Sequence, residues 1–100
     1  MCVEDPPRRH AVRFTLDPAI ARGDIADACE NLASMVGQAR PDVVICDVGE
    51  VAEPTLVVVE ALARLKLTAR RLGVRLLLEH VSDRLRMLLT LTGLTEALSD

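Results

Sequence analysis

Hydrophobic and polar positions follow a period of two near the start of the chain. In residues 10–16, "HAVRFTL", side chains alternate between two faces, and Val12, Phe14 and Leu16 share the apolar one. This alternation predicts a half-buried β-strand. The Asp-Pro pair that follows predicts its end, because proline restricts the residue before it and donates no hydrogen bond.

Two later segments are almost continuously apolar. They are residues 42–48, "DVVICDV", and residues 74–81, "VRLLLEHV". Runs rich in valine, isoleucine and leucine predict buried strands, and the first suggests a central strand covered on both faces.

Between these strands the apolar positions recur at three and four residues. The first such segment begins at Asp24, a good helix N-cap, and its predicted apolar stripe is Ile25, Cys29, Leu32 and Val36. Gly37 stands where a left-handed C-cap is expected, and Pro41 prevents continuation.

The second and third helical segments end at glycines. Residues 55–72 are predicted to be helical, with Gly73 as the C-cap and an apolar stripe of Val58, Leu62, Leu65, Ala69 and Leu72. Ser82 is predicted to cap a helix that Gly93 terminates, with Leu94 placed for a Schellman-type contact. Its inward side chains are expected to be Leu85, Leu88 and Leu89.

Alternating strands and helices predict an α/β fold. Parallel pairing through right-handed crossovers gives a small, open, mostly parallel or mixed β-sheet with helices packed on it. Residues 10–100 are expected to form a single domain, and residues 1–9 a flexible N-terminal tail with nothing to bury.

Composition and charge narrow the classes of function. A net charge of −3 argues against nucleic-acid binding, and the single aromatic residue, Phe14, provides no base-stacking platform. No apolar run is long enough to insert into a membrane. The first ten residues, with acids and two prolines, do not resemble a signal peptide, so we expect a cytoplasmic protein.

The sequence offers no catalytic, metal or cofactor motif. Its three cysteines, Cys2, Cys29 and Cys46, are too scattered for a disulfide framework or a zinc site, and the last two are expected to be reduced core thiols. The two histidines are far apart, with no carboxylate at triad spacing. Four further groups are interpreted as ordinary surface or strand-end residues: Asp47, Glu50, Glu53 and His80.

Residues 42–98 resemble the STAS domain, the family named for sulfate transporters and anti-sigma factor antagonists. The matching features are a strand ending in Asp47, a Gly73 before the next strand, a helix capped by Ser82 and a closing "TGL" at residues 92–94. Residues 11–36 resemble the family more loosely. The resemblance implies a STAS-like fold, and a phosphoacceptor serine in the loop before the second helix, within Asp-Ser-Ser/Thr-Gly.

This chain departs from the family at that loop. An ungapped alignment places Thr55 on the family's aspartate, Leu56 on the phosphoacceptor serine, Val57 on the next position and Val58 on the glycine. The usual acceptor is therefore absent. Thr55 is interpreted as a helix N-cap, with a displaced phosphoacceptor as the weaker alternative. Leu56 and Val57 are expected either to join the core or to form an exposed apolar spot.

The resemblance implies a non-catalytic protein-binding module that docks through Glu53, Pro54, Thr55, Leu56 and Val57. Its expected partner is an anti-sigma factor or a related serine-kinase-type regulator, and the interaction is expected to lack the usual phosphorylation switch. Formation of a homodimer is an open alternative. The alternative is an accessory STAS subunit of a membrane transporter complex. A small-ligand domain is disfavoured because the strand ends lack glycine-rich phosphate loops.

Overall fold

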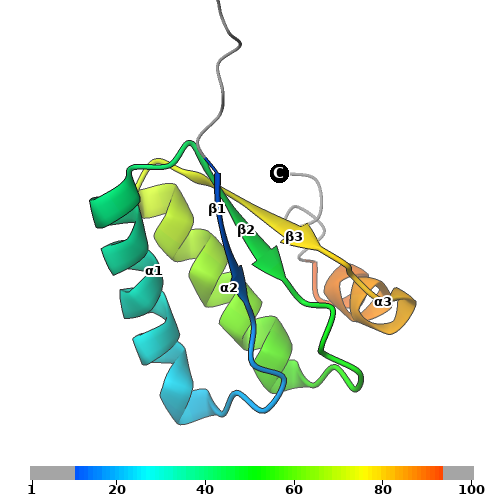
Figure 1. The fold of residues 1–100 in the computed structure, drawn as a ribbon. Helices are drawn as coiled ribbons and strands as arrows, with labels where there is room; N and C mark the ends of the chain where they lie inside the picture. Colours follow the sequence, from blue (N-terminus) through cyan, green and yellow to red (C-terminus); the bar gives the residue numbers. More distant parts are fainter. Residues whose placement is uncertain (1–10, 94–100) are drawn as a thin grey trace, which may run out of the picture.

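Strands and helices alternate through residues 11–93, the part of the chain that the computed structural model describes. Figure 1 shows the arrangement of these elements. They are β1 (Ala11–Thr15), the short 3₁₀ helix η1 (Arg22–Asp24), α1 (Ile25–Ala39), β2 (Val43–Asp47), α2 (Leu56–Arg71), β3 (Arg75–Glu79) and α3 (Asp83–Leu91). The predicted α/β alternation is confirmed.

The three strands form one open sheet in the order β1-β2-β3, and both pairs are parallel. Within residues 11–93 the sheet is thus wholly parallel rather than mixed. The register aligns the strand ends, so that Thr15, Asp47 and Glu79 lie side by side at the carboxyl edge. Chemistry-bearing side chains that follow different strands therefore meet at this edge.

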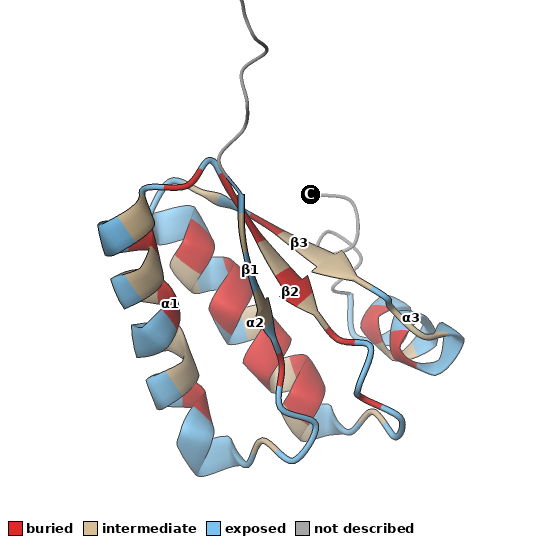
Figure 2. Cartoon of the chain, in the orientation of Figure 1, coloured by how far each residue is buried: buried red, intermediate tan, exposed pale blue. Residues whose placement is uncertain are grey.

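The two faces of the sheet differ in what covers them. Val44, Cys46 and Leu76 point to the inner face and are fully buried, with α1 and α2 packed behind them (Figures 1 and 2). Ile45 and Leu77 point to the outer face and are only half-buried, and none of the described helices lies over it (Figure 1). The prediction that β2 is covered on both faces therefore holds for one face of the described structure.

Helix α1 begins where the sequence predicts, with Asp24 at the N-cap position, but the capping interaction and the end of the helix differ from the prediction. The Asp24 side chain does not cap α1; its Oδ2 accepts a hydrogen bond from the Ala21 backbone N–H at 3.0 Å, at the start of η1. The helix continues past Gly37 to Ala39, and the left-handed residue is Arg40, with φ of 49°. Pro41, rather than Gly37, sets the end, because proline cannot extend the helix and disfavours a right-handed residue before it.

The ends of α2 and α3 agree with the prediction. Thr55 and Ser82 cap their helices through side-chain oxygens, and Gly73 and Gly93 adopt positive φ after the last turns. One predicted position of the apolar stripe is wrong: Leu72 is 39% exposed and is the C-cap residue that follows α2, whereas Ala69 in the last turn is buried in the core. Leu85 and Leu89 are buried, and Leu88 packs partly against the core.

Some predictions concern residues outside the described range. They are the N-terminal tail at 1–9 and the Leu94 contact. None of the described helices combines the length and apolar character needed to cross a membrane.

Candidate functional site

Two loops meet at the carboxyl edge of the sheet. Residues 48–55 connect β2 to α2, and residues 80–82 connect β3 to α3. The carboxylate of Glu53 in the first loop accepts hydrogen bonds from Nη1 of Arg84 on α3, at 3.1 and 3.3 Å. This exposed ion pair links the two junctions across the surface.

The longer loop is anchored by two valines. Val48 and Val51 belong to the hydrophobic core and are almost fully buried, and the Val51 N–H donates to the Val48 carbonyl at 3.1 Å. Between them, Gly49 and Glu50 are exposed. Burial of these two side chains restricts the path of the loop where it passes the core.

Thr55 is the N-cap of α2, which confirms the predicted interpretation. Its hydroxyl oxygen accepts from the Val58 N–H at 3.2 Å, and its backbone is extended. The cap satisfies one of the free amides at the helix start. The threonine hydroxyl is therefore engaged in holding the helix.

Leu56, the first residue of α2, points away from the core. It is 64% exposed, whereas Val58 and Val59 are buried and Val57 is half-buried. Of the two alternatives left open by the sequence, Leu56 therefore fits the exposed apolar spot. The first turn of α2 carries no acidic residue, so an uncharged side chain stands at the positive end of the helix dipole.

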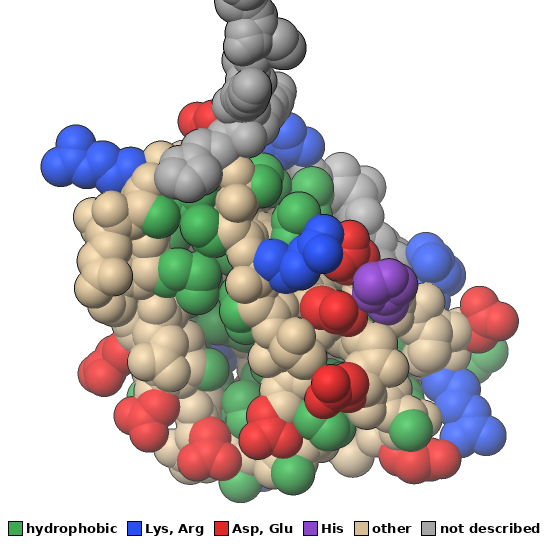
Figure 3. Space-filling view, in the orientation of Figure 1, with side chains coloured by type: hydrophobic (Ala, Val, Ile, Leu, Met, Phe, Trp, Pro, Cys, Tyr) green, Lys and Arg blue, Asp and Glu red, His purple; other side chains and the backbone are tan. Residues whose placement is uncertain are grey.

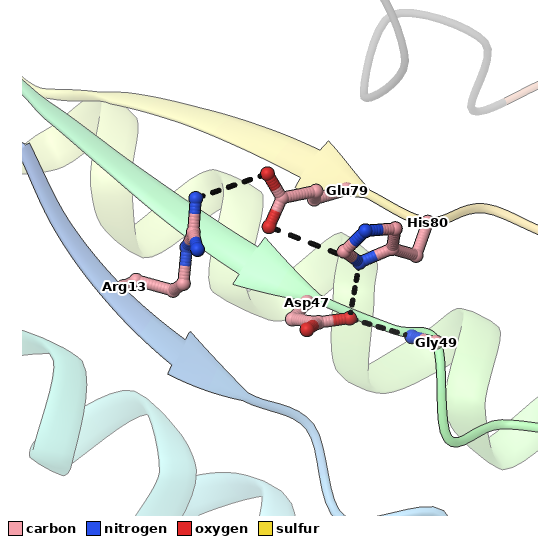
Figure 4. Close-up of polar contacts among 5 residues, drawn as sticks. All are labelled: Arg13, Asp47, Gly49, Glu79 and His80. Atoms are coloured by element: carbon pink, nitrogen blue, oxygen red, sulfur yellow. Dashed lines mark hydrogen bonds and ion pairs between the residues drawn. The ribbon is translucent and has the colours of Figure 1, made fainter.

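A second group of side chains gathers at the same edge, on the outer face (Figure 4). His80 Nδ1 lies 3.1 Å from Asp47 Oδ1 and 3.8 Å from Glu79 Oε1. Arg13 donates to Glu79 Oε2 at 3.0 Å. The Gly49 N–H donates to Asp47 Oδ1 at 2.8 Å. The three strands thus contribute a continuous polar cluster.

Local backbone geometry allows His80 to approach Asp47. His80 has a φ of 62°, in the left-handed region that non-glycine residues rarely adopt. A Cβ on Gly49 would lie 3.1 Å from the His80 Cβ and 3.0 Å from Asp47 Oδ1. The absence of a side chain at position 49 therefore makes room for the contact.

Consecutive residues of β2 have pKa values shifted in opposite directions. The hydrogen bond from the Gly49 N–H, followed by that from His80, lowers the pKa of the Asp47 carboxyl. Burial, with a smaller contribution from the Asp47 charge, raises the pKa of the Cys46 thiol to about 12. At neutral pH, Asp47 is therefore an anion and Cys46 is an inert thiol.

Sequence reasoning treated Asp47 and His80 as separate strand-end groups, and the structure brings them together with Glu79. The signal was present, since each follows or ends a predicted strand and parallel strands end at the same edge. The five predicted docking residues, in contrast, lie together in the 48–55 loop and the first turn of α2, as expected from their adjacency.

A pocket lies on the other side of β1, toward α1. Its volume is about 270 Å³, below the usual range for small-molecule sites. Figure 3 shows hydrophobic side chains between these two elements and acidic ones along the lower margin of the same face. The pocket is lined by apolar groups of Phe14, Ile20 and Ala28 and by carboxylates of Asp17, Asp24 and Asp27.

No protein-family model matches the chain, and no curated protein matches it significantly.

Proposed function

We propose that this protein is a non-catalytic, cytoplasmic binding module of the anti-sigma factor antagonist kind, which docks a regulator through residues 53–57. The observation that carries the proposal is the exposure of Leu56 at the start of α2. In the STAS domains that the sequence resembles, the phosphoacceptor serine stands at this position. A leucine there keeps a surface contact but accepts no phosphate.

The surroundings of Leu56 favour binding because they are held in place before a partner arrives. Thr55 fixes the helix start, and Arg84 holds the Glu53 carboxylate. Pro54 restricts the chain between them. A preorganised surface loses little conformational entropy on association, so more of the contact energy remains as affinity.

The expected partner is an anti-sigma factor or a related serine-kinase-type regulator. In a phosphorylation switch, a phosphate would add about −1.5 to −2 charges at this surface and disturb an apolar contact. With Leu56 in place of the acceptor, the interaction is expected to be permanent under conditions in which a kinase is active. Regulation would then act on the amount of protein.

Binding is tested by replacing Leu56. We expect Leu56→Arg to weaken association with a serine-kinase-type anti-sigma factor from the same cell by about 30-fold, because a central apolar anchor contributes about 2 kcal/mol or more. Leu67→Arg is the matched control, since Leu67 is also an exposed leucine of α2 and lies about 16 Å further along the axis. Isothermal titration calorimetry measures both. Equal affinities of the two variants would contradict the proposed docking surface.

The loss of the switch is tested separately, by incubation with the same kinase and ATP followed by mass spectrometry. We expect no phosphate on residues 53–58 of the natural chain. A phosphate on Thr55 would contradict the permanent interaction and would assign the displaced-acceptor role to that hydroxyl. Thr55→Val, which removes the hydroxyl, is the control that localises any signal.

The accessory-subunit alternative predicts a different partner for the same surface. Affinity capture from the native lysate, with the Leu56→Arg variant in parallel, distinguishes the two. If the natural chain captures a transporter ATPase and the variant does not, the ATPase would take the place of the anti-sigma factor as the proposed partner. Recovery of a sigma-factor regulator with the same dependence on Leu56 would support it.

A further inference from the structure

We propose that Asp47, Glu79 and His80 form a binding site for a divalent transition-metal cation of the zinc class. The three side chains come from the ends of β2 and β3 and share no residue with the docking segment 53–57. The proposal is therefore independent of the proposed function. It also differs from the sequence interpretation, in which these residues carried no common role.

The first support is the arrangement of donor atoms. One ligand atom from each residue lies within 4.8 Å of the other two. His80 Nδ1 is 3.1 Å from Asp47 Oδ1 and 3.8 Å from Glu79 Oε1. Ligand atoms that each lie about 2.0–2.2 Å from a tetrahedral zinc ion are about 3.3–3.6 Å apart. Small side-chain rotations are enough to bring the three donors to one cation.

The second support is an oxygen without a hydrogen-bond donor. Glu79 Oε1 is shielded from solvent and accepts no hydrogen bond, although Oε2 of the same carboxylate accepts from Arg13 at 3.0 Å. A buried carboxylate oxygen without a partner is unfavourable, and such atoms in native proteins call for a physical reason. A cation between Oε1 and His80 Nδ1 would give this oxygen a direct ligand bond in place of the missing hydrogen bond.

Neighbouring groups orient two of the three ligands. The Gly49 N–H donates to Asp47 Oδ1 at 2.8 Å, and Arg13 holds the far oxygen of Glu79 (Figure 4). Hydrogen bonds of this kind fix ligating carboxylates in metal sites and raise affinity. The unusual φ of His80 directs its ring toward both carboxylates, and Gly49 leaves room for it.

The donor set indicates the class of metal. One imidazole nitrogen with two carboxylate oxygens suits zinc and its first-row neighbours, whereas calcium and magnesium prefer oxygen ligands alone. Three protein ligands leave at least one coordination position open, as in sites that bind water or an external ligand. That position would face solvent, because the His80 side chain is 63% exposed.

The experiment titrates the full chain with Zn²⁺ by calorimetry, and with Co²⁺ by visible absorption, after treatment with a chelator. We expect one equivalent of each metal per chain. His80→Ala and Glu79→Gln are each expected to lower affinity by at least about tenfold, since even indirect support of a ligand contributes this much. His10→Ala removes the chain's other histidine, and Glu53→Gln removes an exposed carboxylate elsewhere; both are expected to retain full affinity.

Three results would overturn the proposal. The first is affinity weaker than millimolar for both metals. The second is equal affinity in the natural chain, His80→Ala and Glu79→Gln. The third is a sulfur-to-cobalt charge-transfer band, which would assign the metal to cysteine. Glu79→Gln preserves the shape of the side chain, and circular dichroism of each variant shows whether it is folded.

Discussion

Neighbouring residues of β2 point to opposite faces of the sheet and lie in different surroundings. At the end of β2, Cys46 points inward and is completely buried, whereas Asp47 points outward and accepts hydrogen bonds from Gly49 and His80. Their pKa values are displaced in opposite directions, by burial in one case and by hydrogen bonding in the other. A step of one residue along a strand therefore separates core packing from surface chemistry.

This difference separates the part of the molecule that stabilises the fold from the part for which binding is proposed. The inner face, with α1 and α2, holds most of the large buried side chains, while the polar cluster lies on the outer face and the proposed docking segment 53–57 at the carboxyl edge. Substitutions on the inner face are thus expected to change stability, and those on the outer face and edge to change binding.

The largest expected effect comes from shortening an inner-face leucine. Leu76→Ala is expected to lower the free energy of unfolding by about 2–5 kcal/mol, because it leaves a cavity in the core. The matched variant Leu77→Ala changes the next residue of β3, which is half-buried on the outer face, and should cost less than half as much. Urea denaturation followed by circular dichroism measures both. Similar losses would mean that the outer face is as tightly packed as the inner one.

The next prediction concerns pH and the buried thiol. The pKa of Cys46 is about 12 in the folded protein, above its ordinary value of 9.0, so the folded state keeps a proton that the unfolded chain loses. The contribution of Cys46 to the free energy of unfolding should therefore be constant below pH 9, and above pH 9 it should fall by up to about 1.4 kcal/mol per pH unit.

Cys46→Ala is the control for this pH dependence. It should lower stability at pH 7, because the thiol fills core volume, and it should flatten the decline above pH 9. Denaturant unfolding at a series of pH values gives the two slopes. Parallel slopes would show that Cys46 is not the group responsible.

A smaller loss of stability is expected when the N-cap residues of α2 and α3 are replaced. Thr55→Ala and Ser82→Ala each remove a cap, in which the side-chain oxygen accepts from Val58 or Leu85, and each should cost about 1 kcal/mol. Thr55→Ser retains the hydroxyl and should restore most of the loss. Thermal unfolding compares the three. A Thr55→Ala protein as stable as the natural one would show that the cap is not needed at this junction.

The order of strands and helices could be predicted from the sequence because the spacing of apolar residues in each segment is typical of either a strand or a helix. The alternation around Phe14, the apolar runs of β2 and β3, and the caps at Thr55 and Ser82 are local signals, and all appear in the structure. Local signals failed at α1. A glycine inside a helix costs only about 1 kcal/mol, so Gly37 is tolerated, and Pro41 decides the end.

The polar cluster could not be predicted from local patterns because it depends on register. Asp47 and His80 are separated by 33 positions in the chain and meet because β2 and β3 pair in parallel with Asp47 opposite Glu79. The left-handed backbone of His80 adds a conformation that its residue type does not suggest. The sequence likewise did not decide whether Leu56 is exposed, because the apolar spacing of α2 does not determine which side chains of its first turn contact the core.

The smallest expected effect is that of the outer-face ion pair. Arg13 Nη2 lies 3.0 Å from Glu79 Oε2, with the two side chains 57% and 31% exposed. Pairs in such surroundings contribute less than about 1 kcal/mol, because solvent and salt screen the charges. A double-mutant cycle of Arg13→Ala and Glu79→Gln at low and high salt should give a coupling energy that falls as salt is added. A coupling as large as the Leu76→Ala loss would contradict the division between the two faces, because the outer face would then stabilise the fold as strongly as the core.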